Sequence, residues 1–359
     1  MTPPAWNPRT ARRIVVLRAG GLGDLVFALP ALGALRRAAP DAEIILLGER
    51  WQDELLSGRP SPIDRVEILS PTARTYLATG RLDDPADLDR TLGPLRKPRP
   101  DLAVQIHGGG RTSNPLISRL DAALTIGLRT ADAQALDRWV PYVYYQHEVL
   151  RALEVVGLVG ARATEIEPRL ALVDADFEEA DRSLGDRSRI AVIHPGATDP
   201  RRRWPTDRFA SVGDELAAAG ATVAVIGSAA EADLVDAVGR AMSGPAILLA
   251  GRLSMGGLVG TLARASVVVA NDSGPLHLAA AVGAPTVGVY WCGNLINAGP
   301  FTRTDHRAHL SWRLACPECG VDCTRDRCSH ASSFVAEVGV AEVVEDAIEL
   351  LGELRGRRP

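Results

Sequence analysis

The sequence predicts an α/β protein made of two doubly wound domains of the Rossmann type. Short apolar runs rich in β-branched residues alternate with helical patterns in both halves of the chain, as in sheets of parallel strands. The length of 359 residues exceeds a typical domain of about 150 residues. The apolar fraction of 46% is enough to build two cores.

The first half opens with a βαβ pattern and then becomes more elaborate. Residues 77–100 are polar and proline-rich, which indicates an elaborated connection. The periodicity weakens near residues 165–168, where the first domain is expected to end. The elements predicted for this half are strands at residues 14–17, 43–47 and 102–106 and a helix at residues 25–38, and a predicted helix at residues 174–184 leads into the second half.

The second half alternates strands and helices more regularly. Its predicted strands are residues 189–193, 222–226, 247–249, 267–270 and 286–289, and its helices are residues 206–219, 231–242, 255–263, 276–282 and 340–354. We therefore expect a first domain at residues 1–175 and a second at residues 186–335 that carries a cysteine cluster. Residues 336–359 form a terminal helix that we expect to pack back on the first domain.

Charge and hydropathy exclude several classes of protein. The net charge of -4 gives no basic field of the kind that binds nucleic acid. Residues 1–13 lack the apolar core of a secretory signal, and no apolar run approaches the about 20 residues of a membrane span. We expect a cytoplasmic protein whose contact with a membrane is at most peripheral.

A glycine-rich turn follows the first strand, at Gly20-Gly21-Leu22-Gly23-Asp24. Gly21 and Gly23 permit close approach of a phosphate or an acceptor at a helix N-terminus. The dinucleotide pattern G-x-G-x-x-G is incomplete here, which disfavours a dinucleotide oxidoreductase. Asp24 is either a helix cap or a general base at the carboxyl end of the sheet.

A second motif joins H-P-G-A-T at residues 194–198 to R-R-R-W-P at residues 201–205. Arginine side chains are always charged and bind phosphate in a bidentate manner, so the run is suited to a diphosphate. The alternative is a solvated basic loop.

Two further motifs follow later strands. Glu231 comes after Gly227-Ser228 and is either a ribose ligand or a first-turn carboxylate that the helix dipole favours. Asp272, Ser273 and Gly274 precede a helix, where backbone N–H groups can bind phosphate and a carboxylate can bind sugar hydroxyls. His277, one turn further on, has either a structural or a chemical role.

These motifs occur in a fixed order: R-x-G-G-L-G-D-x-x-x-x-x-P at residues 18–30, H-P-G-A at 194–197, R-x-W-P at 202–205 and N-D-S-G-P-L-H-L-A-A-A at 271–281. Together they resemble glycosyltransferase family 9, whose best-known members are ADP-heptose:lipopolysaccharide heptosyltransferases. The resemblance runs from about residue 14 to the cysteine cluster. It implies a GT-B fold, in which two Rossmann-like domains face a central cleft, with the acceptor on the first domain and the nucleotide sugar on the second.

The resemblance also implies an inverting displacement that needs no metal or other cofactor. Asp24 would then deprotonate the acceptor hydroxyl. Where the family normally has a lysine for the diphosphate, this chain has Arg202, and the two side chains are not equivalent. The donor-binding set implied by position is Thr198, Ser273 and Gly274 for phosphates, Glu231 for ribose, Leu253 for the adenine face and Asp272 for the transferred sugar.

The implied reaction moves a heptose, or a related hexose, from an ADP-sugar to a saccharide or glycoside acceptor. The acceptor is either lipopolysaccharide core or a small natural-product glycoside. Two other functions fit the same architecture. A sugar-nucleotide epimerase or hydrolase would need no acceptor, and a non-catalytic sugar-nucleotide-binding protein would not need Asp24.

Four of the five cysteines crowd one short segment: Cys316, Cys319, Cys323 and Cys328, with His330 close by. Four thiolates are enough for a structural Zn²⁺, and a metal site is the first interpretation in a cytoplasmic chain. Free thiols, a disulfide and an iron–sulfur cluster are the alternatives. Catalysis is not expected here, because the phosphate and sugar motifs lie elsewhere.

Overall fold

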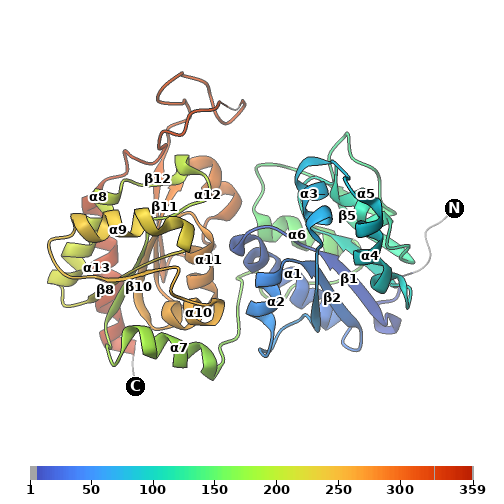
Figure 1. The fold of residues 1–359 in the computed structure, drawn as a ribbon, viewed down its shortest axis with the longest axis horizontal. Helices are drawn as coiled ribbons and strands as arrows, with labels where there is room; N and C mark the ends of the chain where they lie inside the picture. Colours follow the sequence, from blue (N-terminus) through green and yellow to red (C-terminus); the bar gives the residue numbers. More distant parts are fainter. Residues whose placement is uncertain (1–5, 327, 358–359) are drawn as a thin grey trace. The chain divides into compact units, whose positions relative to one another are not determined.

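The computed structural model describes residues 6–326 and 328–357, and for residues 353–357 it describes the helical backbone alone. The chain divides into a first unit, Met1–Ala171, and a second unit, Leu172–Pro359. Each unit contains one six-stranded sheet, and helices and strands alternate along both (Figure 1). The two units are described separately below.

The sheet of the first unit has the strand order β3-β2-β1-β4-β5-β6, and all its neighbouring strands are parallel. The strands are β1 Arg13–Leu17, β2 Glu43–Gly48, β3 Arg65–Ile68, β4 Leu102–Gln105, β5 Leu124–Arg129 and β6 Arg138–Pro141. The helices are α1 Leu22–Ala38, α2 Arg50–Leu56, α3 Pro71–Thr79, α4 Pro85–Arg96, α5 Ser113–Ser118 and α6 Glu148–Gly157.

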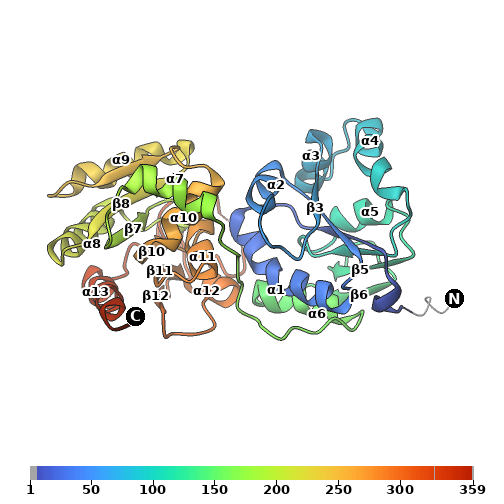
Figure 2. The ribbon, with the colours of Figure 1, turned by 90° about the horizontal axis from the view of Figure 1, so that it is seen from below.

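Helices cover both faces of this sheet. Every residue of β1 is buried, which explains why its sequence is a continuous apolar run and not an alternating one. One face packs against α3, α4 and α5 in a single apolar cluster. Figure 2 shows α1 and α6 together on the other face.

The elaborated connection predicted at residues 77–100 contains the end of α3 and all of α4. Pro71 and Pro85 begin these helices, where a proline has no intrahelical hydrogen bond to lose. Leu88, Leu92 and Leu95 lie at helical spacing and are fully buried.

The sheet of the second unit has the strand order β12-β11-β10-β7-β8-β9, and again all neighbouring strands are parallel. The strands are β7 Ile190–His194, β8 Thr222–Gly227, β9 Ile247–Ala250, β10 Ala265–Asn271, β11 Thr286–Trp291 and β12 His306–Ser311. The helices are α7 Asp174–Leu184, α8 Thr206–Ala218, α9 Ala232–Ala241, α10 Met255–Ala263, α11 Gly274–Ala281, α12 Cys292–Ala298 and α13 Val340–Arg357.

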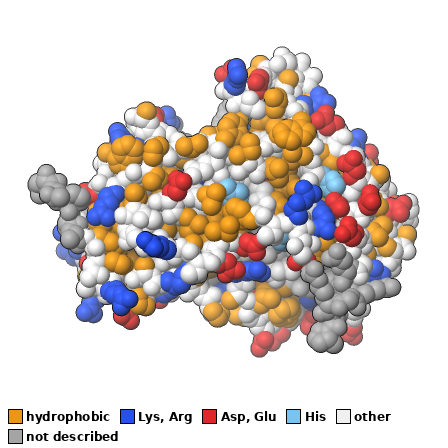
Figure 3. Space-filling model, turned by 180° about the vertical axis from the view of Figure 1, so that it is seen from behind, with side chains coloured by type: hydrophobic (Ala, Val, Ile, Leu, Met, Phe, Trp, Pro, Cys, Tyr) orange, Lys and Arg blue, Asp and Glu red, His pale blue; other side chains and the backbone are white. Residues whose placement is uncertain are grey.

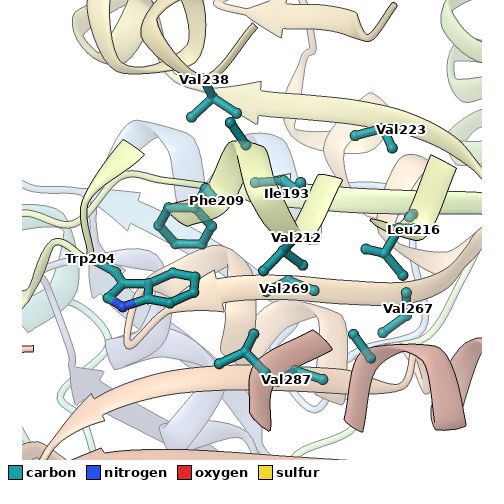
Figure 4. Close-up of a cluster of buried hydrophobic side chains, with 14 of the residues drawn as sticks. Ile193, Trp204, Phe209, Val212, Leu216, Val223, Val238, Val267, Val269 and Val287 are labelled. Atoms are coloured by element: carbon teal, nitrogen blue, oxygen red, sulfur yellow. The ribbon is translucent and has the colours of Figure 1, made fainter. Parts of the chain in front are cut away.

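An extensive apolar core of this unit lies between its sheet and helices α8, α9 and α13. Figure 4 shows strand residues such as Val269 and Val287 facing Phe209 and Val212 of α8. Trp204 closes one end of this core, with its ring 5.1 Å from that of Phe209. The other face of the sheet carries α7, α10, α11 and α12 (Figures 1 and 2).

Two domain boundaries differ from the sequence prediction. The first unit ends at Ala171, not at residue 175, and α7 belongs to the second unit because it packs against α10. The terminal helix α13 was expected to pack on the first domain. Instead the apolar stripe of the helix buries Val343, Ala347 and Leu350 in the core of the second unit.

Basic and acidic side chains are interspersed on the face seen in Figure 3, in agreement with the small net charge of -4. None of the described helices is both long enough and apolar enough to cross a membrane.

Candidate functional site

Three of the sequence motifs come together at the carboxyl ends of β7, β8 and β10. In the sheet β10 and β7 are neighbours, and the chain continues from them in opposite directions, to β11 on one side and to β8 on the other. Such a switch point opens a crevice at the carboxyl ends of the strands, which is where ligands of open α/β sheets bind.

Asn271, the last residue of β10, is hydrogen-bonded to both parts of the motif that follows β7, residues 194–198 and residues 201–205. Its side chain is fully buried. The Nδ2 atom donates to the carbonyl of Pro195 at 2.7 Å, and the Oδ1 atom accepts from the N–H of Trp204 at 2.9 Å. In the sequence Asn271 is recognisable only as part of a motif, and its position at a strand end is the signal that it fixes a loop.

His194 connects the β7 motif to the other two motifs. Its Nδ1 lies 3.0 Å from Oγ of Ser273, and its Nε2 lies 3.6 Å from Oε2 of Glu231. The interaction with His194, together with hydrogen bonds from Ser228, lowers the pKa of Glu231 to about 2. A Cβ atom at Gly196 would lie 1.9 Å from Oε1 of Glu231, so only glycine admits this carboxylate.

Arg202 is the arginine of the R-R-R run that reaches the end of β10. Its Nη1 donates to Oδ2 of Asp272 at 3.0 Å, while His277 Nε2 lies 2.8 Å from Oδ1 of the same carboxylate. Burial raises the pKa of Asp272, but His277 and Arg202 outweigh that effect and hold the pKa below its usual value. Both oxygens of Asp272 are therefore engaged in orienting Arg202 and His277, and its predicted contact with a sugar stays a prediction.

The other two arginines have local partners. Arg201 forms an ion pair with Asp199 at 2.6 Å, and Nε of Arg203 donates to the carbonyl of Ala197 at 2.9 Å. The basic run is thus neither a set of three phosphate ligands nor a freely solvated loop. It presents one guanidinium, that of Arg202, at the switch point.

The remaining donor-binding candidates lie on the same edge of the sheet. Ser273 occupies the position before Gly274, the first residue of α11, and the N–H groups at a helix start have no intrahelical acceptor and attract anions. Thr198 is exposed on the loop after β7. Leu253 is half-buried after β9, beside the turn in which the N–H of Gly251 donates to the carbonyl of Gly227 at 2.8 Å.

Asp24 in the first unit both caps a helix and forms an ion pair. Its Oδ2 accepts from the N–H of Gly21 at 2.7 Å, and its Oδ1 lies 2.8 Å from Nη2 of Arg18. The side chain is still 44% exposed, so an external group can reach it. Gly20, which the sequence analysis did not select, has a φ of 111° and no room for a Cβ beside Asp24, whereas Gly23 lies in the first turn of α1.

Arg18 is the centre of a polar network that the sequence analysis did not predict. Its guanidinium is nearly buried and also pairs with Glu148 at 3.3 Å and donates to the carbonyl of Ile106 at 2.5 Å. Burial and the charge of Arg18 lower the pKa of the nearby His107. Glu148 is distant in sequence and lies in no recognisable motif, so only the fold reveals it.

The cysteine segment gathers a different set of ligands from the one predicted. One ligand atom each of Cys316, Cys319, Cys328 and His330 lies within 4.8 Å of the others. The Sγ of Cys323 lies 3.9 Å from that of Cys328 and is not one of the four. All five cysteines of the chain are free thiols, so a disulfide is not formed.

The second of the two parallel sheets has a basic side chain and a helix N-terminus at its switch point, an arrangement that suits an anionic ligand such as a phosphate. The model of the family described as glycosyltransferase family 9 (heptosyltransferase) matches residues 106–323. Lipopolysaccharide heptosyltransferase 2 of Escherichia coli (strain K12) is 33% identical over 298 residues, which are 77% of this chain and 82% of the relative. The chain belongs to glycosyltransferase family 9 and is a glycosyltransferase.

Solved structures confirm the predicted two-domain α/β fold of the GT-B type. A family 9 glycosyltransferase from Veillonella parvula superposes with a TM-score of 0.79 at 21% identity, over 97% of this chain and 99% of that one. The E. coli heptosyltransferase WaaC with ADP-2-deoxy-2-fluoro heptose gives a TM-score of 0.63 at 19% identity, over 82% of this chain and 92% of that one.

Proposed function

We propose that the chain transfers a heptose, or a related hexose, from an ADP-sugar to an acceptor hydroxyl, with inversion at the sugar carbon. The observation that carries the proposal is the position of Arg202. Its guanidinium lies beside the start of α11 at the β7–β10 switch point, bonded to Asp272 at 3.0 Å. A diphosphate placed there would meet a fixed cation and the N–H groups of a helix N-terminus.

The other donor contacts follow from the same edge of the sheet. Ser273, Gly274 and Thr198 would bind phosphate oxygens. Glu231, ionised over the whole neutral range because its pKa is about 2, would accept hydrogen bonds from ribose hydroxyls, and Leu253 would cover the adenine. The ADP-sugar analogue that WaaC carries in its solved structure supports the choice of ADP.

The chemistry needs positive charge on the donor side and a proton acceptor on the acceptor side. The sugar passes through a state with oxocarbenium character while the diphosphate gains negative charge, and Arg202 with the helix N-terminus stabilises that charge. Asp24 would accept the proton of the attacking hydroxyl. Its carboxylate has about four lone-pair positions, so the bonds to Arg18 and Gly21 leave others for the acceptor.

The acceptor hydroxyl, with one carboxylate as its base, attacks the sugar carbon directly, and no glycosyl-enzyme bond forms. Because the displacement occurs only once, the anomeric centre is inverted. For the acceptor we propose a saccharide hydroxyl. It belongs either to lipopolysaccharide core, which the names of the relatives mention, or to a small glycoside. The cytoplasmic location expected from the sequence stays a prediction.

The test is isothermal titration of the purified protein with ADP-heptose, GDP-mannose and UDP-glucose. We expect ADP-heptose alone to bind. Arg202→Ala should weaken binding at least about tenfold, since a charge-assisted phosphate contact contributes about 1.5–3 kcal/mol. Arg202→Lys, which keeps the charge, should retain most of the affinity.

Arg182→Ala is the matched control, because Arg182 is exposed on α7, and it should leave the affinity unchanged. Binding of no nucleotide sugar, or full affinity in Arg202→Ala, would contradict the proposal. ADP released from ADP-heptose at the same rate with and without saccharide acceptors would favour a hydrolase.

A further inference from the structure

The four clustered cysteines lie in the segment between β12 and α13. Residues 312–339 connect β12 to α13, and those of them that the structure describes, 312–326 and 328–339, form no helix or strand apart from a single bridge between Ala315 and Asp322. Figure 1 shows this segment, at the brown end of the colour scale, leading away from the rest of its unit. Long irregular segments within a domain are uncommon and are usually functional.

Four side chains of this segment have the geometry of a metal site. Besides the 4.8 Å limit that relates all four ligand atoms, Sγ of Cys316 and Nδ1 of His330 are 3.7 Å apart. A tetrahedral Zn²⁺ with Zn–S of about 2.3 Å and Zn–N of about 2.0 Å would separate sulfur and nitrogen by about 3.5 Å. Three thiolates and one imidazole complete a closed structural site of the Cys₃His type.

The surroundings support the same four ligands. The N–H of Cys316 donates to the carbonyl of Val321 at 2.8 Å, and the N–H of Gly320 donates back to the carbonyl of Cys316 at 3.0 Å. Gly320 has a φ of 75°, which turns the chain tightly after Cys319. Oε2 of Glu318 lies 3.7 Å from Nε2 of His330, on the ring nitrogen away from Cys316, where metal-binding histidines have an orienting carboxylate.

The same segment holds the backbone on both sides of Arg202. The N–H of Phe334 donates to the carbonyl of Arg201 at 2.7 Å, and Oγ of Ser333 donates to the carbonyl of Arg203 at 2.6 Å. Ser333 and Phe334 follow the ligand His330 by only a few residues. A short stretch of chain therefore connects the cysteine segment to the backbone on both sides of Arg202, whose side chain is hydrogen-bonded to Asp272.

We infer that Cys316, Cys319, Cys328 and His330 bind one Zn²⁺, with Cys323 outside the ligand set, and that this ion positions Arg202 and so controls the affinity for the donor diphosphate. The second part rests on the proposed function of Arg202. The ion itself takes no part in sugar transfer. It acts by restricting residues 312–339, and through them the arginine loop at residues 199–205.

The ligand set is tested on the full-length protein by its metal content. Mass spectrometry of the purified protein should find about one zinc per chain. Cys319→Ser should lose the zinc, and Glu318→Gln should weaken zinc binding roughly 10–100-fold. Cys323→Ser is the matched control and should keep it. Absence of zinc, iron in its place, or equal loss in Cys323→Ser and Cys319→Ser would overturn the assignment.

The coupling is tested by hydrogen exchange and by titration with ADP, with the zinc present, removed by a chelator and added back. Removal should speed exchange at residues 199–205 and weaken ADP binding at least about tenfold, and added zinc should restore both. Unchanged exchange and unchanged affinity after zinc removal would overturn the coupling. If the zinc-loaded protein binds no ADP, the proposed donor site fails, while metal content and exchange still decide the inference.

Discussion

Replacing Asn271 by alanine removes the side chain that joins the loops of the donor site. Its amide bonds to the carbonyl of Pro195 at 2.7 Å and to the N–H of Trp204 at 2.9 Å. Trp204 and Pro195 are themselves buried, so water cannot readily replace the lost partner. A buried polar group left without a partner costs about 1–3 kcal/mol, and two such groups predict a loss of about 2–6 kcal/mol in the stability of the second unit.

Calorimetry of the whole protein measures this loss. For a unit of this size a change of 1 kcal/mol shifts the Tm by roughly 2–4 °C, so the transition of the second unit should fall by roughly 4–24 °C. Ser211→Ala, an exposed position on α8 of the same unit, should change stability by less than about 0.5 kcal/mol. If Asn271→Ala behaves like Ser211→Ala, the loops after β7 do not depend on this amide.

Three other changes have expected outcomes. Gly196→Ala should displace Glu231, since the new Cβ would lie 1.9 Å from its Oε1. ADP binding measured by titration should therefore weaken. Gly244→Ala is the control and should bind ADP as before, because its new Cβ would have no atom within 4 Å. Glu231 is ionised down to a pKa of about 2 in the folded chain against an ordinary value of 4.5, so its stabilisation is complete above about pH 4.5 and is lost as the pH falls towards 2. Glu231→Gln should therefore flatten the acid unfolding profile in that window, and an unchanged profile would contradict the pairing with His194. Asp24→Asn should reduce sugar transfer about 10²–10⁴-fold with donor affinity unchanged, and near-normal transfer would exclude the base role.

The strands and helices of the second unit were largely predictable, because parallel strands covered on both faces are continuous apolar runs. Helices α7 and α10 begin and end at the predicted residues. Helix α4 was harder to recognise, because its prolines and charged residues obscure the helical spacing of its three buried leucines. Where α13 packs depends on which core has an open face, and a helical pattern carries no such information.

The candidate site likewise combines residues that the sequence predicts with contacts that only the fold reveals. Arg202, Glu231 and Ser273 were predicted from their positions after strands, and the parallel sheet brings them to one edge. The engagement of both oxygens of Asp272 was not predictable, because it depends on the distance between two loops about 70 residues apart. The sequence prediction placed His330 close to the cysteines but gave Cys323 as the fourth metal ligand, since sequence spacing does not reveal which thiols point towards one another.

The most direct measurement is a crystal structure of the protein with ADP-heptose bound. The diphosphate should lie between the guanidinium of Arg202 and the N-terminus of α11, with the ribose at Glu231 and the adenine at Leu253. A nucleotide found at the Gly20–Asp24 turn of the first unit, or at any place away from the carboxyl ends of β7 and β10, would contradict the assignment of the donor to the second unit.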